Sequence, residues 1–212
     1  LADGLLTISG HGGLCKRTLN TAGTATWTAG NIILAEGSVL NNLGTFDVRV
    51  DGGLSGAGTF SNMGELLKSV GSGVTAFSVT FNNAGLVDAR GGTLGFTSYT
   101  QTAGEIRLNG GAVSCPLLDI QGGMVTGSGT ISGGVINRGQ VTPGLAAEPI
   151  GILEVRGNYV QPATADAGGP YAVDEGGGRE LAGSVSESAG GLKIEIGGLL
   201  AGTDFDQLNV VG

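Results

Sequence analysis

The chain has 212 residues, of which 44 are glycine, 40% are hydrophobic and 13% are charged, and its formal net charge is −8. Its 10 Lys and Arg residues form no basic cluster, so the composition excludes a phosphate-binding surface and we expect no nucleic-acid partner. No apolar run approaches the length of about 18 residues that a membrane-spanning helix needs, so no membrane span is expected. The apolar content is sufficient for a core, and the glycine therefore indicates many tight turns rather than disorder.

The N-terminal segment, residues 1–17, precedes the repeats of the chain, and we expect it to form an N-terminal cap. It contains the single histidine, His11, which stands between two glycines without the motif of a catalytic triad or a zinc site. We expect this histidine to be exposed. Because the chain begins at Leu1 without a signal-like segment and both ends fall within pattern-like sequence, we interpret it as part of a longer protein.

A seven-residue phrase, apolar–polar–Asn–x–Gly–x–apolar, occurs three times between residues 40 and 87, and looser copies precede and follow it. Its glycines recur roughly every 20 residues, a spacing that is typical of a repeat architecture. The glycines are Gly23, Gly44, Gly64, Gly85, Gly104, Gly123 and Gly139. We expect each to occupy a turn whose backbone conformation is costly for other residues.

Two columns of the repeat have a constant chemical character. The residues two positions after each glycine are all apolar and are expected to point inward: Ala25, Phe46, Leu66, Val87, Ile106, Val125 and Val141. The residues two positions before each glycine are all polar, and we expect them to bond turn backbone and each other from coil to coil: Thr21, Asn42, Asn62, Asn83, Thr102, Gln121 and Asn137.

Short alternating runs, such as residues 45–51 and 105–108, lie between the phrases and predict strands of about 3 to 6 residues. Such strands with glycine corners predict an all-β fold, a right-handed parallel β-helix (β-solenoid) with about 20 residues per coil. A leucine-rich repeat has a similar period, but its leucine pattern is absent here. We assign residues 18–161 to coils, 162–190 to an inserted acidic Gly-rich loop and 191–212 to the final strands.

The C-terminal part carries a family resemblance. Residues 137–144, 157–161, 192–198 and 204–210 resemble the end of autotransporter-type β-helix passenger repeats, which belong to large bacterial surface and secreted proteins. The resemblance implies a secreted or cell-surface location in a bacterium and a role such as that of an adhesin. Residues 165–171, with 175–177 and 181–184, resemble the first strands of a PKD-like, immunoglobulin-type repeat, and we interpret them as a short insertion.

Three charged residues form the only constellation suited to catalysis. Asp47, Asp88 and Arg107 each follow a phrase glycine by three positions and are expected to face outward. A glycosidase needs two carboxyl groups about 5 to 9.5 Å apart, and the two aspartates, two coils apart, would be separated by roughly 9.6 Å. Leu67 between them argues against an evolved cleft. The alternatives are solvated surface charge, a binding groove, or the site of a polysaccharide hydrolase or lyase.

Other candidates have simpler interpretations. The two cysteines, Cys15 and Cys115, are predicted to lie five coils, roughly 24 Å, apart, so we expect two separate, mostly buried thiols without a disulfide. We assign Trp27 to the core or the cap rather than to a sugar-stacking platform. We expect no cofactor. The candidates for calcium are acidic residues of the C-terminal part: Asp166, Asp174 and Glu175, or the surroundings of Asp204 and Asp206.

The sequence therefore favours a structural or adhesive β-helix segment of a bacterial secreted or cell-surface protein, with an outward binding surface. A carbohydrate-active protein that binds or cleaves polysaccharide is the alternative, and a spacer that binds nothing is the third. The partners we expect are a polysaccharide or a host or cell-surface ligand. End-to-end self-association is a further expectation, because the terminal coils of a solenoid expose strand edges.

Overall fold

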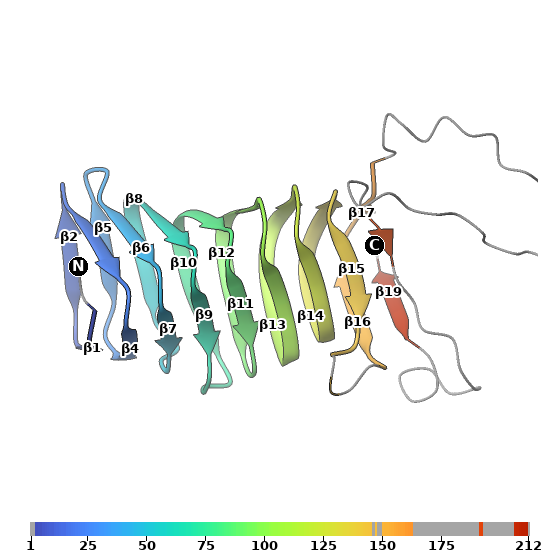
Figure 1. Ribbon diagram of the computed structural model, residues 1–212, viewed down its shortest axis with the longest axis horizontal. Helices are drawn as coiled ribbons and strands as arrows, with labels where there is room; N and C mark the ends of the chain where they lie inside the picture. The colour runs from blue at the N-terminus through green and yellow to red at the C-terminus, as the bar shows by residue number, and fades with distance from the viewer. Residues whose placement is uncertain (1–2, 146, 148–149, 163–190, 193–205, 212) are drawn as a thin grey trace, which may run out of the picture.

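The computed structural model describes residues 3–145, 147, 150–162, 191–192 and 206–211, and they form an all-β structure without helices. Its strands pair in parallel and succeed one another along one long axis, from the N-terminal coil at one end to β16 and β19 near the other (Figure 1). The chain is thus a β-solenoid whose stacked coils are each about 20 residues long, which confirms the predicted fold class.

The strands of the N-terminal part have 4 to 6 residues, except β8 and β10, which have 10. They are β1 (Leu5–Ser9), β2 (Gly12–Cys15), β3 (Thr18–Thr21), β4 (Thr24–Ala29), β5 (Ile32–Ala35), β6 (Val39–Asn42), β7 (Thr45–Val48), β8 (Gly53–Asn62), β9 (Glu65–Lys68), β10 (Val74–Asn83) and β11 (Leu86–Ala89). The remaining strands complete the solenoid: β12 (Thr93–Gln101), β13 (Glu105–Ile120), β14 (Met124–Asn137), β15 (Gln140–Pro143), β16 (Ile152–Arg156), β17 (Tyr159–Val160), β18 (Gly191–Leu192) and β19 (Gln207–Val211). The prediction of short strands is wrong for β8, β10, β12, β13 and β14, which are all longer than expected. These strands run through a corner, where the register shifts but pairing with the neighbouring coil continues.

The predicted inward column is a continuous buried file. Each of its members pairs with the next in register, through β4, β7, β9, β11, β13, β14 and β15. Their relative exposure is between 0% and 3%. The apolar residue two positions after each glycine therefore forms the spine of the core, as predicted.

The N-terminal segment continues the same stacking. Strand β1 pairs with β4, so that Leu6 lies beside Ala25, and β2 pairs with β5. The segment assigned to a cap is therefore built as a terminal coil. The acidic Gly-rich loop assigned to residues 162–190, which includes the PKD-like segment, lies outside the described residues except for residue 162. Of the final strands assigned to residues 191–212, the described residues form β18, which pairs with β15, and β19, which pairs with β16.

The phrase glycines are required mainly by the close approach of successive coils. At Gly44, Gly64 and Gly85, a Cβ atom would lie 2.1 Å from the carbonyl oxygen of the phrase glycine one coil earlier. Their φ angles lie outside the positive range, so the predicted conformational reason is wrong for them. It is confirmed at Gly104 and Gly123, where φ is +75° and +76°.

Beside the apolar file runs a buried ladder of polar side chains. Thr21 Oγ1 donates to Asn42 Oδ1 at 3.1 Å, and Asn42 Nδ2 donates to Asn62 Oδ1 at 2.8 Å. Asn62 Nδ2 donates to Asn83 Oδ1 at 2.8 Å, and Asn83 Nδ2 donates to Gln101 Oε1 at 3.1 Å. Each Asn amide also donates to a backbone carbonyl near the following corner, so that the ladder joins five coils through groups that would be costly to bury unpaired.

Two residues that were predicted to belong to this ladder are not part of it. Thr102 and Gln121 are exposed, and the ladder position of their coils is held by Gln101 and Ile120. The spacing between phrase glycines becomes shorter at this point, while the strands keep their inward alternation, so the position two before the glycine turns outward. Ile120 interrupts the ladder, and Asn137 stands next to it in register.

An aromatic file lies next to the ladder. Phe60, Phe81 and Tyr99 stack in register with ring centroids 5.2 and 5.3 Å apart. The Tyr99 hydroxyl donates to Gln101 Oε1 at 3.2 Å, and burial raises the pKa of Tyr99 well above its ordinary value, so this hydroxyl stays protonated. The interior is therefore specified by both packing and hydrogen bonds.

Candidate functional site

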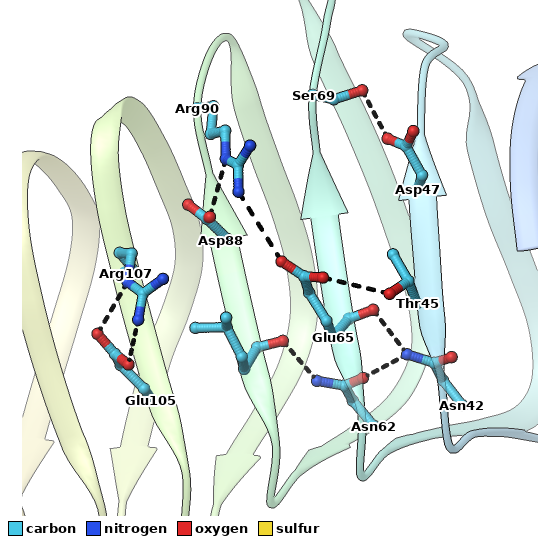
Figure 2. A network of polar contacts seen from close by, with 11 residues as sticks. Asn42, Thr45, Asp47, Asn62, Glu65, Ser69, Asp88, Arg90, Glu105 and Arg107 are labelled. Atoms are coloured by element: carbon cyan, nitrogen blue, oxygen red, sulfur yellow. Dashed lines mark hydrogen bonds and ion pairs between the residues drawn. The ribbon is translucent and has the colours of Figure 1, made fainter. Parts of the chain in front are cut away.

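Charged side chains gather on one outward face, on the strands that directly follow the phrase glycines (Figure 2). We term this set the charged strip, and its members are Asp47, Arg49, Glu65, Asp88, Arg90, Glu105 and Arg107. In register, Asp47 lies beside Leu67, Leu67 beside Asp88, and Asp88 beside Arg107. The structure therefore brings the three predicted site residues into one file, with Leu67 between the two aspartates as expected.

An acidic residue followed two positions later by an arginine recurs along the strip. Residues i and i+2 of a strand project to the same side, so the two side chains meet. Asp47 accepts from Arg49 Nε at 2.6 Å, and Asp88 accepts from Arg90 Nε at 2.9 Å. Sequence analysis did not identify this motif, although the period of two would have revealed it.

The third pair of the strip, Glu105 with Arg107, is bidentate. Arg107 Nε and Nη2 donate to the two Glu105 carboxylate oxygens at 3.1 and 2.8 Å. The hydrogen bond with Glu105 is the main cause that raises the pKa of Arg107 above its ordinary value, so its charge is fixed. Thr126 Oγ1 of the next coil donates to Glu105 Oε1 at 2.5 Å, which joins the pair to β14.

Glu65 connects the coils on either side of it. Thr45 Oγ1 donates to Glu65 Oε2 at 3.2 Å, and Arg90 Nη2 lies 3.9 Å from Glu65 Oε1 (Figure 2). Together with the acid–x–arginine pairs, these contacts cross-link the outward face from β7 to β11, and the Glu105–Arg107 pair with Thr126 links β13 to β14. The strip is thus an ordered surface rather than a set of separate solvated charges.

The two aspartates are buried, which corrects their interpretation as solvated surface charge. The relative exposure is 4% for Asp47 and 1% for Asp88, although both face outward between inward neighbours. Each carboxylate is paired with the longer side chain of the arginine that directly follows its strand, and Arg49 and Arg90 themselves remain about half exposed.

The two aspartates differ in one contact. Asp47 Oδ1 accepts a hydrogen bond from Ser69 Oγ at 2.5 Å, and its Oδ2 accepts from Arg49, so both oxygens are satisfied. Asp88 Oδ2 accepts from Arg90, but no protein group in the described residues donates to Asp88 Oδ1, which is itself buried. Asp88 therefore carries a carboxylate oxygen without a partner.

This arrangement does not resemble an open pair of glycosidase carboxyl groups. Such a pair needs one group free to protonate the leaving oxygen and a second that faces the sugar or a water. Asp47 and Asp88 are both buried, both bonded to arginine and separated by Leu67. The two carboxyl groups therefore do not match the geometry that acid–base cleavage of a glycosidic bond needs.

The side chains of Trp27 and His11 do not take part in the contacts of the charged strip. Trp27 is fully buried, as predicted, and its Nε1 donates to the carbonyl oxygens of Ala29 and Gly30 at 3.1 and 3.2 Å. His11 is exposed, as predicted, and its Nδ1 accepts from the backbone N–H of Asn31 at 3.2 Å. Both residues therefore have structural contacts in the first coils.

The cysteines are both free, which confirms the absence of a bridge between them. Cys115 is buried, and its thiol donates to the Leu117 carbonyl at 3.1 Å; burial raises the pKa of this thiol, so it is unreactive. Cys15 is exposed, so the prediction that it is mostly buried is wrong. It lies at the end of β2 in the first coil, where Leu14 takes the inward position.

The calcium candidates Asp166, Asp174, Glu175 and Asp204 lie outside the described residues. Asp206 is described and buried, and its Oδ1 accepts from the Gly151 N–H at 2.8 Å, which is a structural contact. Within the described part of the chain, no three His, Cys, Asp or Glu residues are grouped so that they could hold a metal ion. The same residues contain no helix long and apolar enough to cross a membrane.

Lys68 is a buried charge that sequence analysis missed. It holds the inward position between Val48 and Ala89, and its side chain is fully buried. Its Nζ donates to Asp51 Oδ1 at 2.8 Å and to Thr75 Oγ1 at 3.0 Å. The hydrogen bond with Lys68 is the main cause that lowers the pKa of Asp51. The sequence could have predicted this buried charge, because Lys68 occupies an inward position of the strand at which the neighbouring coils have Val48 and Ala89.

A second outward face contrasts with the charged strip. Over five coils, the outward residues of β3, β6 and the C-terminal halves of β8, β10 and β12 carry no charge. We term them the uncharged strip, and its members are Thr18, Asn20, Val39, Asn41, Thr59, Ser61, Thr80, Asn82, Ser98 and Thr100. The solenoid thus presents two regular outward surfaces of different chemistry.

Comparison with known proteins finds no matching family model, no matching curated protein and no matching solved structure. The function of the chain is therefore inferred from its fold and from the residues on its outward faces.

Proposed function

We propose that the chain is a rigid structural and adhesive segment of a bacterial secreted or cell-surface protein, and that its outward side chains form the binding surface. The observation that supports this proposal most strongly is the charged strip, whose side chains are ordered by one another on a continuously stacked core. In a solenoid each coil packs on its neighbours, so outward groups keep a fixed spacing of about 4.8 Å along the axis.

A repetitive surface of this kind is suited to an extended partner. A polysaccharide or a cell-surface ligand offers hydrogen-bonding groups over many ångströms, and a rigid surface binds it without the entropy cost of ordering loops. The bacterial secreted or surface location is supported by the resemblance to autotransporter-type passenger repeats at residues 137–144 and 157–161. The alternative, polysaccharide cleavage by Asp47, Asp88 and Arg107, is disfavoured by the burial and ion pairing of both aspartates.

The experiment that tests this function measures binding and turnover together. The purified chain is incubated with immobilised bacterial and plant polysaccharides, retention is measured, and the supernatant is assayed for reducing ends and unsaturated products. Retention without products is the expected result. Products that disappear in an Asp88→Asn variant would establish the cleavage function instead, and a chain that binds none of the surfaces and releases nothing would leave only the spacer role.

A further inference from the structure

The equivalent aspartate, Asp47, shows which hydrogen bond the buried Oδ1 of Asp88 lacks. Asp47 and Asp88 stand in the same file, two coils apart, and each accepts from the arginine two positions later. At Asp47, the second oxygen is satisfied by a hydroxyl group, that of Ser69 in the following coil. The chain itself therefore shows that this position is suited to a hydroxyl donor.

At Asp88 the corresponding hydroxyl is absent. Leu67 is the register partner of Asp47 in the following coil, and Ser69 lies two positions after it. The corresponding partner of Asp88 is Arg107, and the residue two positions after it is Asn109. Asn109 is exposed, and no hydrogen bond joins it to Asp88. A buried carboxylate oxygen without a donor is unfavourable, and a group that supplies the donor is bound more tightly for that reason.

We propose that Asp88 Oδ1 accepts a hydrogen bond from a hydroxyl group of a neutral saccharide that lies across β9, β11 and β13. The proposal rests on the binding function proposed above and names the ligand class for one part of its surface. Figure 2 shows the Asp88 carboxylate between Arg90 of its own coil and Arg107 of the next. A carboxylate beside guanidinium groups matches a sugar with neighbouring hydroxyls, because one hydroxyl donates to the carboxylate while the next accepts from an arginine N–H.

The charges of the strip favour a neutral ligand. Four carboxylates and three arginines alternate along it, so neither a polyanion nor a polycation meets a surface of one sign. A cation is also disfavoured, because only one oxygen is free and the Arg90 guanidinium lies against the other. A hydroxyl group can both donate and accept, so it complements the free oxygen and the arginines together.

Access to the oxygen requires one flexible side chain to move. Asp88 Oδ1 is shielded in the unbound chain, whereas the side chains of Arg90 and Arg107 are 47% and 35% exposed. Rotation of Arg107 breaks its ion pair with Glu105, in which both side chains are partly exposed, and such a pair contributes less to stability than the buried contact of Arg90 with Asp88. The bond that the ligand supplies to a buried charge is the stronger of the two.

The test uses the whole chain and three neutral probes, namely cellohexaose, xylohexaose and maltohexaose, in saturation-transfer NMR titrations. Saturable binding of at least one of them is expected, with affinity weakened about tenfold by Asp88→Asn, which replaces the charge-assisted acceptor with an amide. Asn109→Ser is the decisive second variant because it leaves Asp88 intact. By supplying the internal hydroxyl, it should raise the melting temperature and weaken the binding. Glu154→Gln, which alters an acid–x–arginine pair on β16, outside the strip, is the control and should bind like the wild type.

The outcomes separate this inference from the proposed function. Equal affinity of wild type, Asp88→Asn and Asn109→Ser for the neutral probe would overturn the site at Asp88 while leaving an adhesive surface elsewhere on the chain. Tighter binding of an anionic probe, hexagalacturonate, would overturn the neutral ligand class. Absence of binding to all three neutral probes would overturn the inference, whereas the proposed function fails only if the chain is also not retained on any polysaccharide or cell-surface material.

Discussion

The close approach of two coils at a phrase glycine predicts a large effect for one methyl group. In a Gly64→Ala variant, the new Cβ atom would lie 2.1 Å from the Gly44 carbonyl oxygen and 2.8 Å from the Gly44 nitrogen. Ordinary contact between carbon and oxygen is well over 3 Å, so the two coils must separate by about 1 Å at this corner. The same carbonyl accepts the hydrogen bond from the Glu65 N–H at 2.7 Å, and separation stretches that bond.

The magnitude follows from these two effects. Overpacking of a rigid interior costs about 1 to 3 kcal/mol, and each backbone hydrogen bond that is stretched or lost costs about 1 kcal/mol more. We expect Gly64→Ala to lower the free energy of unfolding by about 2 to 4 kcal/mol, which corresponds to a melting temperature lower by roughly 4 to 16 °C in a chain of this length. Because the φ angle of Gly64 is not positive, backbone strain makes no contribution.

Thermal and urea unfolding followed by circular dichroism measure this effect. Gly12→Ala is the matched control, since a Cβ atom at Gly12 meets nothing within 4 Å and its φ angle is likewise not positive. Gly12→Ala should melt within about 2 °C of the wild type, as expected for a substitution away from contacts. If Gly64→Ala were as stable as Gly12→Ala, the argument that glycine is needed for coil-to-coil approach would be refuted.

Three further predictions concern the interior. Leu66→Asp, which buries an unpaired charge in the apolar file, should lower the free energy of unfolding by more than about 4 kcal/mol, whereas Met63→Asp, at an exposed position, should have a far smaller effect in the same urea titration. Asn62→Ala removes two donated hydrogen bonds and one accepted bond of the ladder and should cost about 2 to 4 kcal/mol; unchanged unfolding would show that the ladder contributes no stability. Because Lys68 lowers the pKa of Asp51 below 3.8, its stabilisation is complete above that pH and is lost as the pH falls through the lowered value. The melting temperature of the wild type should therefore fall more steeply below about pH 4 than that of Lys68→Met, and parallel acid profiles would contradict this linkage.

The fold could be predicted because the same pattern of apolar residues and glycines recurs along the sequence. The apolar column from Ala25 to Val141 recurs at nearly constant spacing, and parallel stacking brings equivalent positions into contact. The polar ladder could be predicted only where the spacing stays constant. At Thr102 the coil is shorter, and inward alternation of the strand, rather than distance from the glycine, decides which residue turns inward.

The candidate site was harder to predict because burial on an outward face depends on neighbouring side chains. Alternation correctly placed Asp47 and Asp88 outward, but both are buried and paired with arginines that directly follow their strands. The difference between the two depends on Ser69 and Asn109, one coil further, and becomes visible only when the register is known. Lys68 escaped detection for a related reason: its partner Asp51 was expected on a strand over residues 45–51, whereas β7 ends at Val48 and Asp51 lies in the corner that follows.

The central claim, that equivalent residues of successive coils form one buried file, is tested most directly by methyl–methyl NOEs in a sample labelled at Ile, Leu and Val. The register predicts cross-peaks between Leu66 and Val87, between Val87 and Ile106, and between Ile106 and Val125, with none between Leu66 and Ile106. Absence of the three sequential cross-peaks, or a strong one that skips a coil, would contradict the stacking on which the site and its proposed ligand depend.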